Sequence, residues 1–170
     1  TGVYIIVATL IAPALIKLGI EPMAGHMFLL YFGIMSMVTP PVALSDFAPA
    51  NIAGADPTQT GFTATRIGWA AYVVPFLLAL SPSLLLRGHP LVIAWAVLTA
   101  AIGIWLGTLG AIGYLAAPLG RGVRALLFAA GFLTLFPADI FAGAWLIDVA
   151  GLGLGALLVG RELTRARARA

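Results

Sequence analysis

Cysteine is absent from the 170 residues, and charged side chains make up only 9% of them. The lack of cysteine excludes disulfide bonds and thiolate metal sites, and it leaves the redox compartment undefined. Soluble domains carry about a quarter charged residues, whereas this chain is 62% hydrophobic with a mean hydropathy of +1.09. The composition therefore predicts an all-α integral membrane protein.

Sequence patterns of known catalytic sites are also missing. The two histidines, His26 and His89, lie in predicted turns without activating partners, and there is no phosphate-binding loop, HExxH motif or carboxylate pair at catalytic spacing. An enzyme is therefore not expected, and no cofactor is implied. The net charge of +3 comes largely from a basic tail, which fits a cytoplasmic membrane anchor better than a nucleic-acid patch. The tail arginines are Arg161, Arg165, Arg167 and Arg169.

The chain opens on Thr1 and Gly2 and is apolar at once, without an initiator methionine or the charged start of a signal peptide. We therefore expect it to be the C-terminal part of a longer protein.

The segment most informative about function is 36–41, which ends in two consecutive prolines inside an apolar stretch. Proline has no N–H, its ring clashes with the carbonyl one turn back, and the residue before it avoids the α region. The pair is therefore predicted to break a helix and to free several main-chain carbonyls. In lipid such a break survives only inside protein or beside a water-filled cavity. Discontinuous helices of this kind bind ions and anionic substrates in secondary transporters.

Hydrophobic runs predict the membrane segments, with two half-helices on either side of the break. Pro75 is expected to kink the span that contains it, and Gly103, Gly107 and Gly110 have the small-residue spacing of closely packed membrane helices. The predicted segments are 2–18, 23–35, 42–52, 62–86, 91–118, 123–136 and 140–160.

The loop 87–90 is the predicted boundary between two domains, residues 1–87 and residues 88–170. The second is expected to hold about three transmembrane segments and the basic tail. With the tail in the cytoplasm, counting back one crossing per span places Asp139 outside and Arg121 and Arg124 inside. The prediction is a multi-pass protein with a cytoplasmic C-terminus.

Two acidic residues lie within predicted membrane segments. Asp46 falls on the first turns of the second half-helix, where the helix dipole stabilises a carboxylate, and an intramembrane Asp suggests a polar pathway. The alternative is that Asp46 only caps the half-helix or faces a wet crevice. Asp148 lies in the last span and is open to two interpretations. It has a functional role, or it is a residue near a membrane surface or paired with a neighbour.

Three stretches stand out as a set: YFGIMSMVTPPVA at 31–43, IAGADP at 52–57 and TGF at 60–62. Together they resemble the large permease subunit of TRAP transporters (DctM type). The strongest likeness is to fused permeases that work with TAXI-type periplasmic binding proteins. The resemblance covers 1–87, and residues 88–170 resemble, through weaker motifs, the extra C-terminal membrane region of such fused members.

The resemblance implies a function and a fold. The family imports carboxylate-type solutes across the bacterial inner membrane with a sodium gradient, and a periplasmic binding protein delivers the solute. Its fold has two inverted repeats, each with a re-entrant hairpin and a broken helix. By resemblance, Gly2–Leu18 is the outgoing arm of the second hairpin and Met23–Gly54 is the second broken helix. The expected partners are the lipid bilayer, the binding protein and the missing N-terminal part of the same permease.

The resemblance also implies a sodium site between the hairpin tip and the helix break. Oxygen ligands suit a hard cation such as sodium. Pro40 and Pro41 would keep the break open rather than bind. The candidate ligands are the carbonyls near Thr1, Gly2, Ser36, Met37 and Val38, together with the Thr39 hydroxyl.

Two alternatives remain open from the residues alone. One is a permease of another ion-coupled anion family with a similar broken helix. The other is a non-transporting membrane anchor or assembly subunit, in which the glycine-rich helices of 91–160 are the working part.

Overall fold

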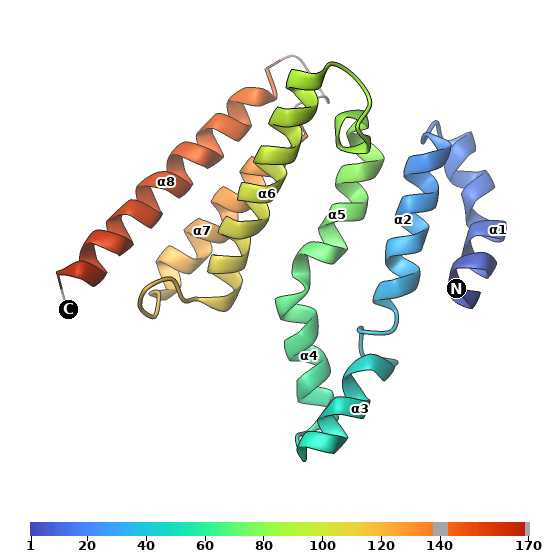
Figure 1. The fold of residues 1–170 in the computed structure, drawn as a ribbon, viewed down its shortest axis with the longest axis horizontal. Helices are drawn as coiled ribbons and strands as arrows, with labels where there is room; N and C mark the ends of the chain where they lie inside the picture. The colour runs from blue at the N-terminus through green and yellow to red at the C-terminus, as the bar shows by residue number, and fades with distance from the viewer. Residues whose placement is uncertain (138–142, 169–170) are drawn as a thin grey trace. The chain divides into compact units, whose positions relative to one another are not determined.

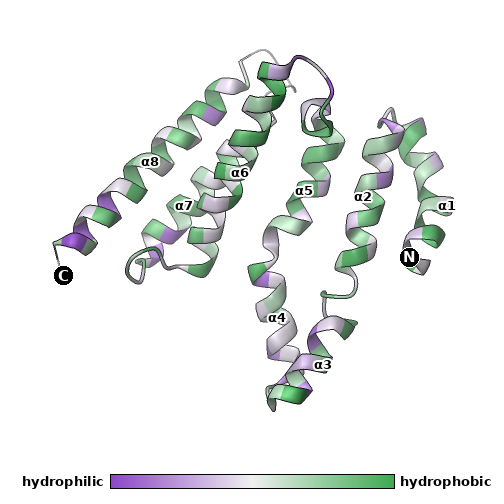
Figure 2. Ribbon diagram, viewed as in Figure 1, coloured by the Kyte–Doolittle hydropathy of each residue, from purple (hydrophilic) through white to green (hydrophobic). Residues whose placement is uncertain are grey.

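The computed structural model describes residues 1–137 and 143–168, which form helices and no strands (Figure 1). The chain divides into two compact units, Thr1–Ala79 and Leu80–Ala170. Within the described residues, two helical stretches are long and apolar enough to cross a membrane, Pro57–Leu80 and Pro90–Ile112. Figure 2 shows that hydrophobic residues predominate along most helices and that hydrophilic ones gather at the C-terminal end of α8. These features fit a membrane protein.

The first unit begins with a helical hairpin made of α1 (Gly2–Lys17) and α2 (Pro22–Met35). Gly19 turns the chain with a φ of 88°, a left-handed value that favours glycine, and Pro22 stands at the start of α2, where its missing N–H costs nothing. A Cβ added at Gly33 would lie 3.7 Å from the Cα of Tyr4, so the two helices touch near the start of α1. This pairing places the first residues of the chain beside the end of α2.

The rest of the first unit comprises α3 (Leu44–Ala53), α4 (Pro57–Ile67) and α5 (Trp69–Leu80). Phe28 and Phe32 of α2 meet Phe76 of α5, with ring centroids 5.1 and 5.8 Å apart. Aromatic side chains therefore connect α2 to α5.

The predicted span 62–86 is wrong at both ends. Helix α4 begins at Pro57 because the Asp56 carboxylate caps it, with Oδ1 accepting from the Gln59 N–H at 2.7 Å. The helical stretch is interrupted at Gly68 and ends at Leu80, whereas Pro75 lies inside α5. The chain therefore departs from regular helix at a glycine, and the kink at Pro75 stays a prediction.

The second unit comprises a short 3₁₀ turn, η1 (Pro82–Leu85), and three helices: α6 (Pro90–Ile112), α7 (Arg121–Thr134) and α8 (Trp145–Arg167). Its apolar core contains Leu106, Leu127, Ala130 and Leu158. The predicted close packing of glycines in α6 is confirmed.

The closest approach is between α6 and α7. A Cβ at Gly131 of α7 would lie 2.5 Å from the N of Gly107, and one at Gly110 would lie 2.6 Å from the carbonyl O of Arg124. Glycine at these positions lets the two backbones touch.

The predicted span 91–118 is too long, because α6 stops at Ile112. Gly113 takes a left-handed φ of 83°, and the Arg124 side chain donates to the carbonyls of Gly110 and Ala111 at 3.2 and 3.0 Å. The last predicted span, 140–160, corresponds to α8 from Trp145 onward. Asp139, residues 140–142 of that span and Arg169 lie outside the described residues.

Candidate functional site

The segment 36–43, between α2 and α3, is the irregular part of the first unit. Helix α2 ends at Met35, whose carbonyl accepts from the N–H of both Val38 and Thr39. The Pro40–Pro41 peptide bond is cis, and α3 starts after Ala43, a fully buried residue with a φ of 30°. A non-glycine residue at positive φ is uncommon and is found disproportionately at functional sites. The chain therefore leaves the helix where the two prolines predict it.

The prolines decide which carbonyls lose their helical partners. In a continuous helix the carbonyls of Ser36 and Met37 would accept from residues 40 and 41, which have no N–H here. The Met37 carbonyl instead accepts from the N–H of Ser45 at 3.1 Å. Within the described residues, the carbonyls of Ser36 and Val38 accept no main-chain hydrogen bond. Two main-chain oxygens are thus left for another partner.

A cavity of about 510 Å³ lies between the start of α1 and the end of α2. It brings together four of the six predicted ion ligands, Thr1, Gly2, Met37 and Val38. The carbonyl of Thr1 is already used inside α1, where it accepts from the Ile5 N–H at 3.0 Å. The remaining lining residues are Val3, Tyr4, Leu30, Gly33, Ile34 and Ser45.

The other two predicted ligands, Ser36 and Thr39, line a separate cavity of about 380 Å³ with Pro40, Pro41 and Tyr72. The Ser36 hydroxyl donates to the Gly33 carbonyl at 2.8 Å. The Thr39 hydroxyl donates to the Met35 carbonyl at 2.6 Å, so the Tyr72 hydroxyl, also 2.6 Å away, is the donor to Thr39.

Tyr72 was not among the predicted site residues. In the sequence it is distinguished only by a polar hydroxyl within an apolar helical segment. In the structure it links α5 to the irregular segment through Thr39.

Asp46 lies in the first turn of α3 and lines neither of these cavities. Its N–H donates to the Ala43 carbonyl at 3.0 Å. Its Oδ2 atom is buried and has no hydrogen-bond partner within the described part of the chain. The structure therefore does not bring Asp46 to the cavity of Thr1 and Val38.

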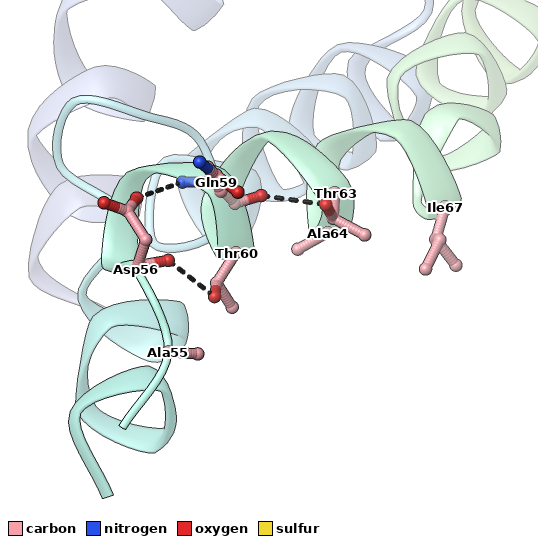
Figure 3. A pocket seen from close by; sticks show the side chains of 7 residues that line it. All are labelled: Ala55, Asp56, Gln59, Thr60, Thr63, Ala64 and Ile67. Carbon is pink, nitrogen blue, oxygen red and sulfur yellow. Dashed lines mark hydrogen bonds between the residues drawn. The ribbon is translucent and has the colours of Figure 1, made fainter. Parts of the chain in front are cut away.

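A third cavity, of about 420 Å³, lies along the start of α4 (Figure 3). The hydroxyls of Thr60 and Thr63 donate to the carbonyls of Asp56 and Gln59, one turn back, at 2.8 Å each. These side chains give α4 a polar face, although their donors are satisfied within the helix. No candidate site was predicted there.

The fold and the site together define an all-helical membrane protein with an irregular, carbonyl-exposing connection between two helices. Residues 1–93 match the model of the family "Tripartite ATP-independent periplasmic transporter, DctM component". Because this match covers more than half of the 170 residues, the chain belongs to that family. No curated protein and no solved structure matches the chain.

Membership has three consequences. It makes the chain part of a TRAP transporter permease, which is a transporter component. It implies a periplasmic binding protein and the lipid bilayer as partners. It also rejects the alternative that the chain is a permease of another ion-coupled anion family.

Proposed function

We propose that this chain is the C-terminal portion of a sodium-coupled permease that imports a carboxylate-type solute across the bacterial inner membrane. A TAXI-type periplasmic protein delivers the solute, and the basic C-terminal tail lies in the cytoplasm. Membership of the DctM family supports the transporter class. Uptake measurements test the coupling ion and the solute class.

The observation that carries the proposal is the cavity shared by Thr1, Gly2, Met37 and Val38. The Val38 carbonyl has no main-chain partner among the described residues, and a carbonyl at membrane depth requires one. Sodium, like other hard cations, takes oxygen ligands. A sodium ion held by main-chain oxygens at the end of α2 would satisfy the Val38 carbonyl, which the irregular segment leaves without a main-chain partner.

In this proposal α2 and α3 are the two halves of one discontinuous transmembrane helix, and α1 is the outgoing arm of a re-entrant hairpin. Both belong to one repeat of an inverted-repeat fold, and we expect the other repeat in the sequence that precedes Thr1. Half-helices around a midplane ion site are the arrangement by which secondary transporters couple ions to substrates. Helices α6–α8 form a C-terminal extension for which bracing or anchoring is the simplest role.

The test is uptake of a labelled carboxylate solute by the full permease in liposomes, with its binding protein added. We expect uptake when an inward sodium gradient is imposed and none with an equal potassium gradient. Uptake that proceeds equally with potassium, or that follows an imposed proton gradient instead, would reject sodium coupling.

The double variant Thr39→Ala and Pro40→Ala locates the ion site. It removes the hydroxyl that binds the Met35 carbonyl and restores an N–H opposite the Ser36 carbonyl, so sodium dependence should weaken. The matched control is Thr9→Ala with Pro13→Ala in α1, which also removes a threonine bonded one turn back and a helical proline. The proposal requires that the control retain the sodium dependence of the parent.

A further inference from the structure

The helices of the second unit bury polar groups at one end of the unit. Asp148 of α8 is 1% exposed, Thr99 of α6 is 5% exposed and Thr134 of α7 is fully buried. A Cβ at Gly151, one turn after Asp148, would press on the Thr134 hydroxyl. The apolar core of Leu106, Leu127 and Leu158 belongs to the same three helices. Three helices thus contribute to a buried polar cluster around Asp148.

Only one of the two oxygens of the Asp148 carboxyl group has a hydrogen-bond partner among the described residues. The indole N–H of Trp95 donates to its Oδ2 at 3.0 Å. Its Oδ1 is buried and has no partner among the residues that the structure describes. The Thr99 hydroxyl, one turn after Trp95, donates to the carbonyls of Trp95 and Ala96 in its own helix and so offers Asp148 no proton.

No cation compensates this carboxyl group from the elements packed against α8. Helix α6 contains no charged residue, and Arg124 of α7 is bonded to the opposite end of α6 at Gly110 and Ala111. The charged residues of α8 begin at Arg161, thirteen positions on, or about 20 Å along the helix. The other titratable residues of the unit are Arg121 at the start of α7, Tyr114 between α6 and α7, and Arg87 and His89 before α6. Within residues 1–137 and 143–168, none of these forms an ion pair or a hydrogen bond with Asp148, and Asp139 lies outside the described residues.

Residues 138–142, which the structure does not describe, contain no lysine or arginine by sequence. A lone carboxylate in such surroundings is costly, and burial of this kind is relieved by neutralising the group. The neutral acid carries one O–H and keeps an acceptor for the Trp95 indole. We propose that Asp148 is a proton-binding site, with the proton held on its carboxyl group at neutral pH inside the α6–α8 helices.

In the binding step one hydrated proton from the aqueous solution adds to the Asp148 carboxylate and neutralises its charge, and the Trp95 hydrogen bond stays in place. It does not depend on the proposed sodium site, which is built from residues of the first unit. Asp148 is therefore a second ion-responsive group of the permease, and its ligand is the proton.

Infrared spectroscopy of the full permease in lipid nanodiscs tests this proposal. At about pH 7 we expect a carbonyl stretch of a protonated carboxylic acid that shifts in D₂O and is absent from Asp148→Asn. The matched control is Asp46→Asn, which removes the other aspartate with a buried unpartnered oxygen and should leave this band unchanged. An Asp148→Asn spectrum identical to the parent in this region would overturn the proposal.

Two further measurements separate a proton from a metal cation. Asp148→Asn is a neutral isostere, so its thermal midpoint at pH 7 should match the parent, whereas collapse of the variant would show that the negative charge is needed. Adding sodium or potassium chloride to the parent should leave the acid band in place. A band that disappears as either cation is added would mean that the carboxylate binds the metal, and the proton assignment would fail.

Discussion

Replacing both Pro40 and Pro41 by alanine should repair the helix break and weaken sodium binding. The new N–H groups at 40 and 41 could donate to the carbonyls of Ser36 and Met37, one helical turn back. The prolines cannot form these two hydrogen bonds because they have no N–H. The segment could then continue α2 as a helix. In the proposed function, sodium would have to unwind that helix before it could bind.

The size of the effect follows from the contacts that change. Proline costs about 3 kcal/mol relative to alanine in a helix interior, and two adjacent sites are not additive, so we take about 3 kcal/mol for the pair. Continuing α2 through this segment would break the hydrogen bond from the Ser45 N–H to the Met37 carbonyl, at a cost of about 1 kcal/mol. The net bias of about 2 kcal/mol corresponds to about 30-fold in the apparent sodium constant, if the two forms are otherwise equal in free energy.

The assay is initial uptake by the reconstituted full permease as a function of external sodium, normalised to the amount of folded protein. Pro13→Ala is the control, because Pro13 lies inside α1 and away from the irregular segment. A sodium constant for the Pro40→Ala, Pro41→Ala variant within twofold of the parent, at equal maximal uptake, would refute the idea that the break supplies the ion ligands.

Two further variants probe the contacts that hold each unit together. Gly131→Ala should lower the thermal midpoint, at a cost of about 3 kcal/mol, because its Cβ would lie 2.5 Å from the backbone N of Gly107; Gly153→Ala, with nothing within 4 Å of its Cβ, should not. Equal midpoints for the two variants would contradict the observed α6–α7 packing. Tyr72→Phe removes the donor to Thr39 and should cost about 1 kcal/mol of unfolding free energy, measured by denaturant titration; no change would mean that this hydrogen bond is not formed.

Local chemistry made the irregular segment predictable. The absence of an N–H at two successive residues is a covalent fact, so the sequence predicts the end of α2 at Met35 without knowledge of any neighbour. The predicted start of the second half-helix, residue 42, is two residues before Leu44. This small error arises because Ala43 adopts a left-handed backbone conformation, which an alanine does not predict.

The predicted span 62–86 failed for a different reason. The predicted span starts at residue 62 and leaves the Asp56–Pro57 pair outside the helix, yet these two residues are an N-cap and a first helical position. No irregularity was predicted at Gly68, where the chain departs from helix seven residues before Pro75. Turn chemistry and helix-capping chemistry use the same residue types, so the sequence alone could not separate them.

Contacts across long sequence separations were beyond the sequence analysis. The Thr39–Tyr72 bond joins residues 33 positions apart, and the Trp95–Asp148 bond joins residues 53 positions apart. Each depends on the rotation of one helix about its axis relative to another. Periodicity defines that rotation poorly in helices that are apolar on every side. Asp148 was accordingly left with two interpretations, and the structure shows a buried carboxyl group paired with the Trp95 indole.

The contrast between local chemistry and the folded structure also refines the proposed ion site. The sequence shows which carbonyls lose a helical donor, but only the structure shows which carbonyls find another partner. The Met37 carbonyl, whose helical donor would be residue 41, regains a partner through the Ser45 N–H. The Val38 carbonyl could accept from the Val42 N–H in a continuous helix, but Val38 lines the cavity of Thr1 and Gly2 and its carbonyl has no main-chain partner among the described residues. Ser36 also lacks one but lines the cavity of Tyr72. If sodium binds beside α1, Val38 is therefore the strongest ligand candidate of the three, and Ser36 would have to change its surroundings to join it.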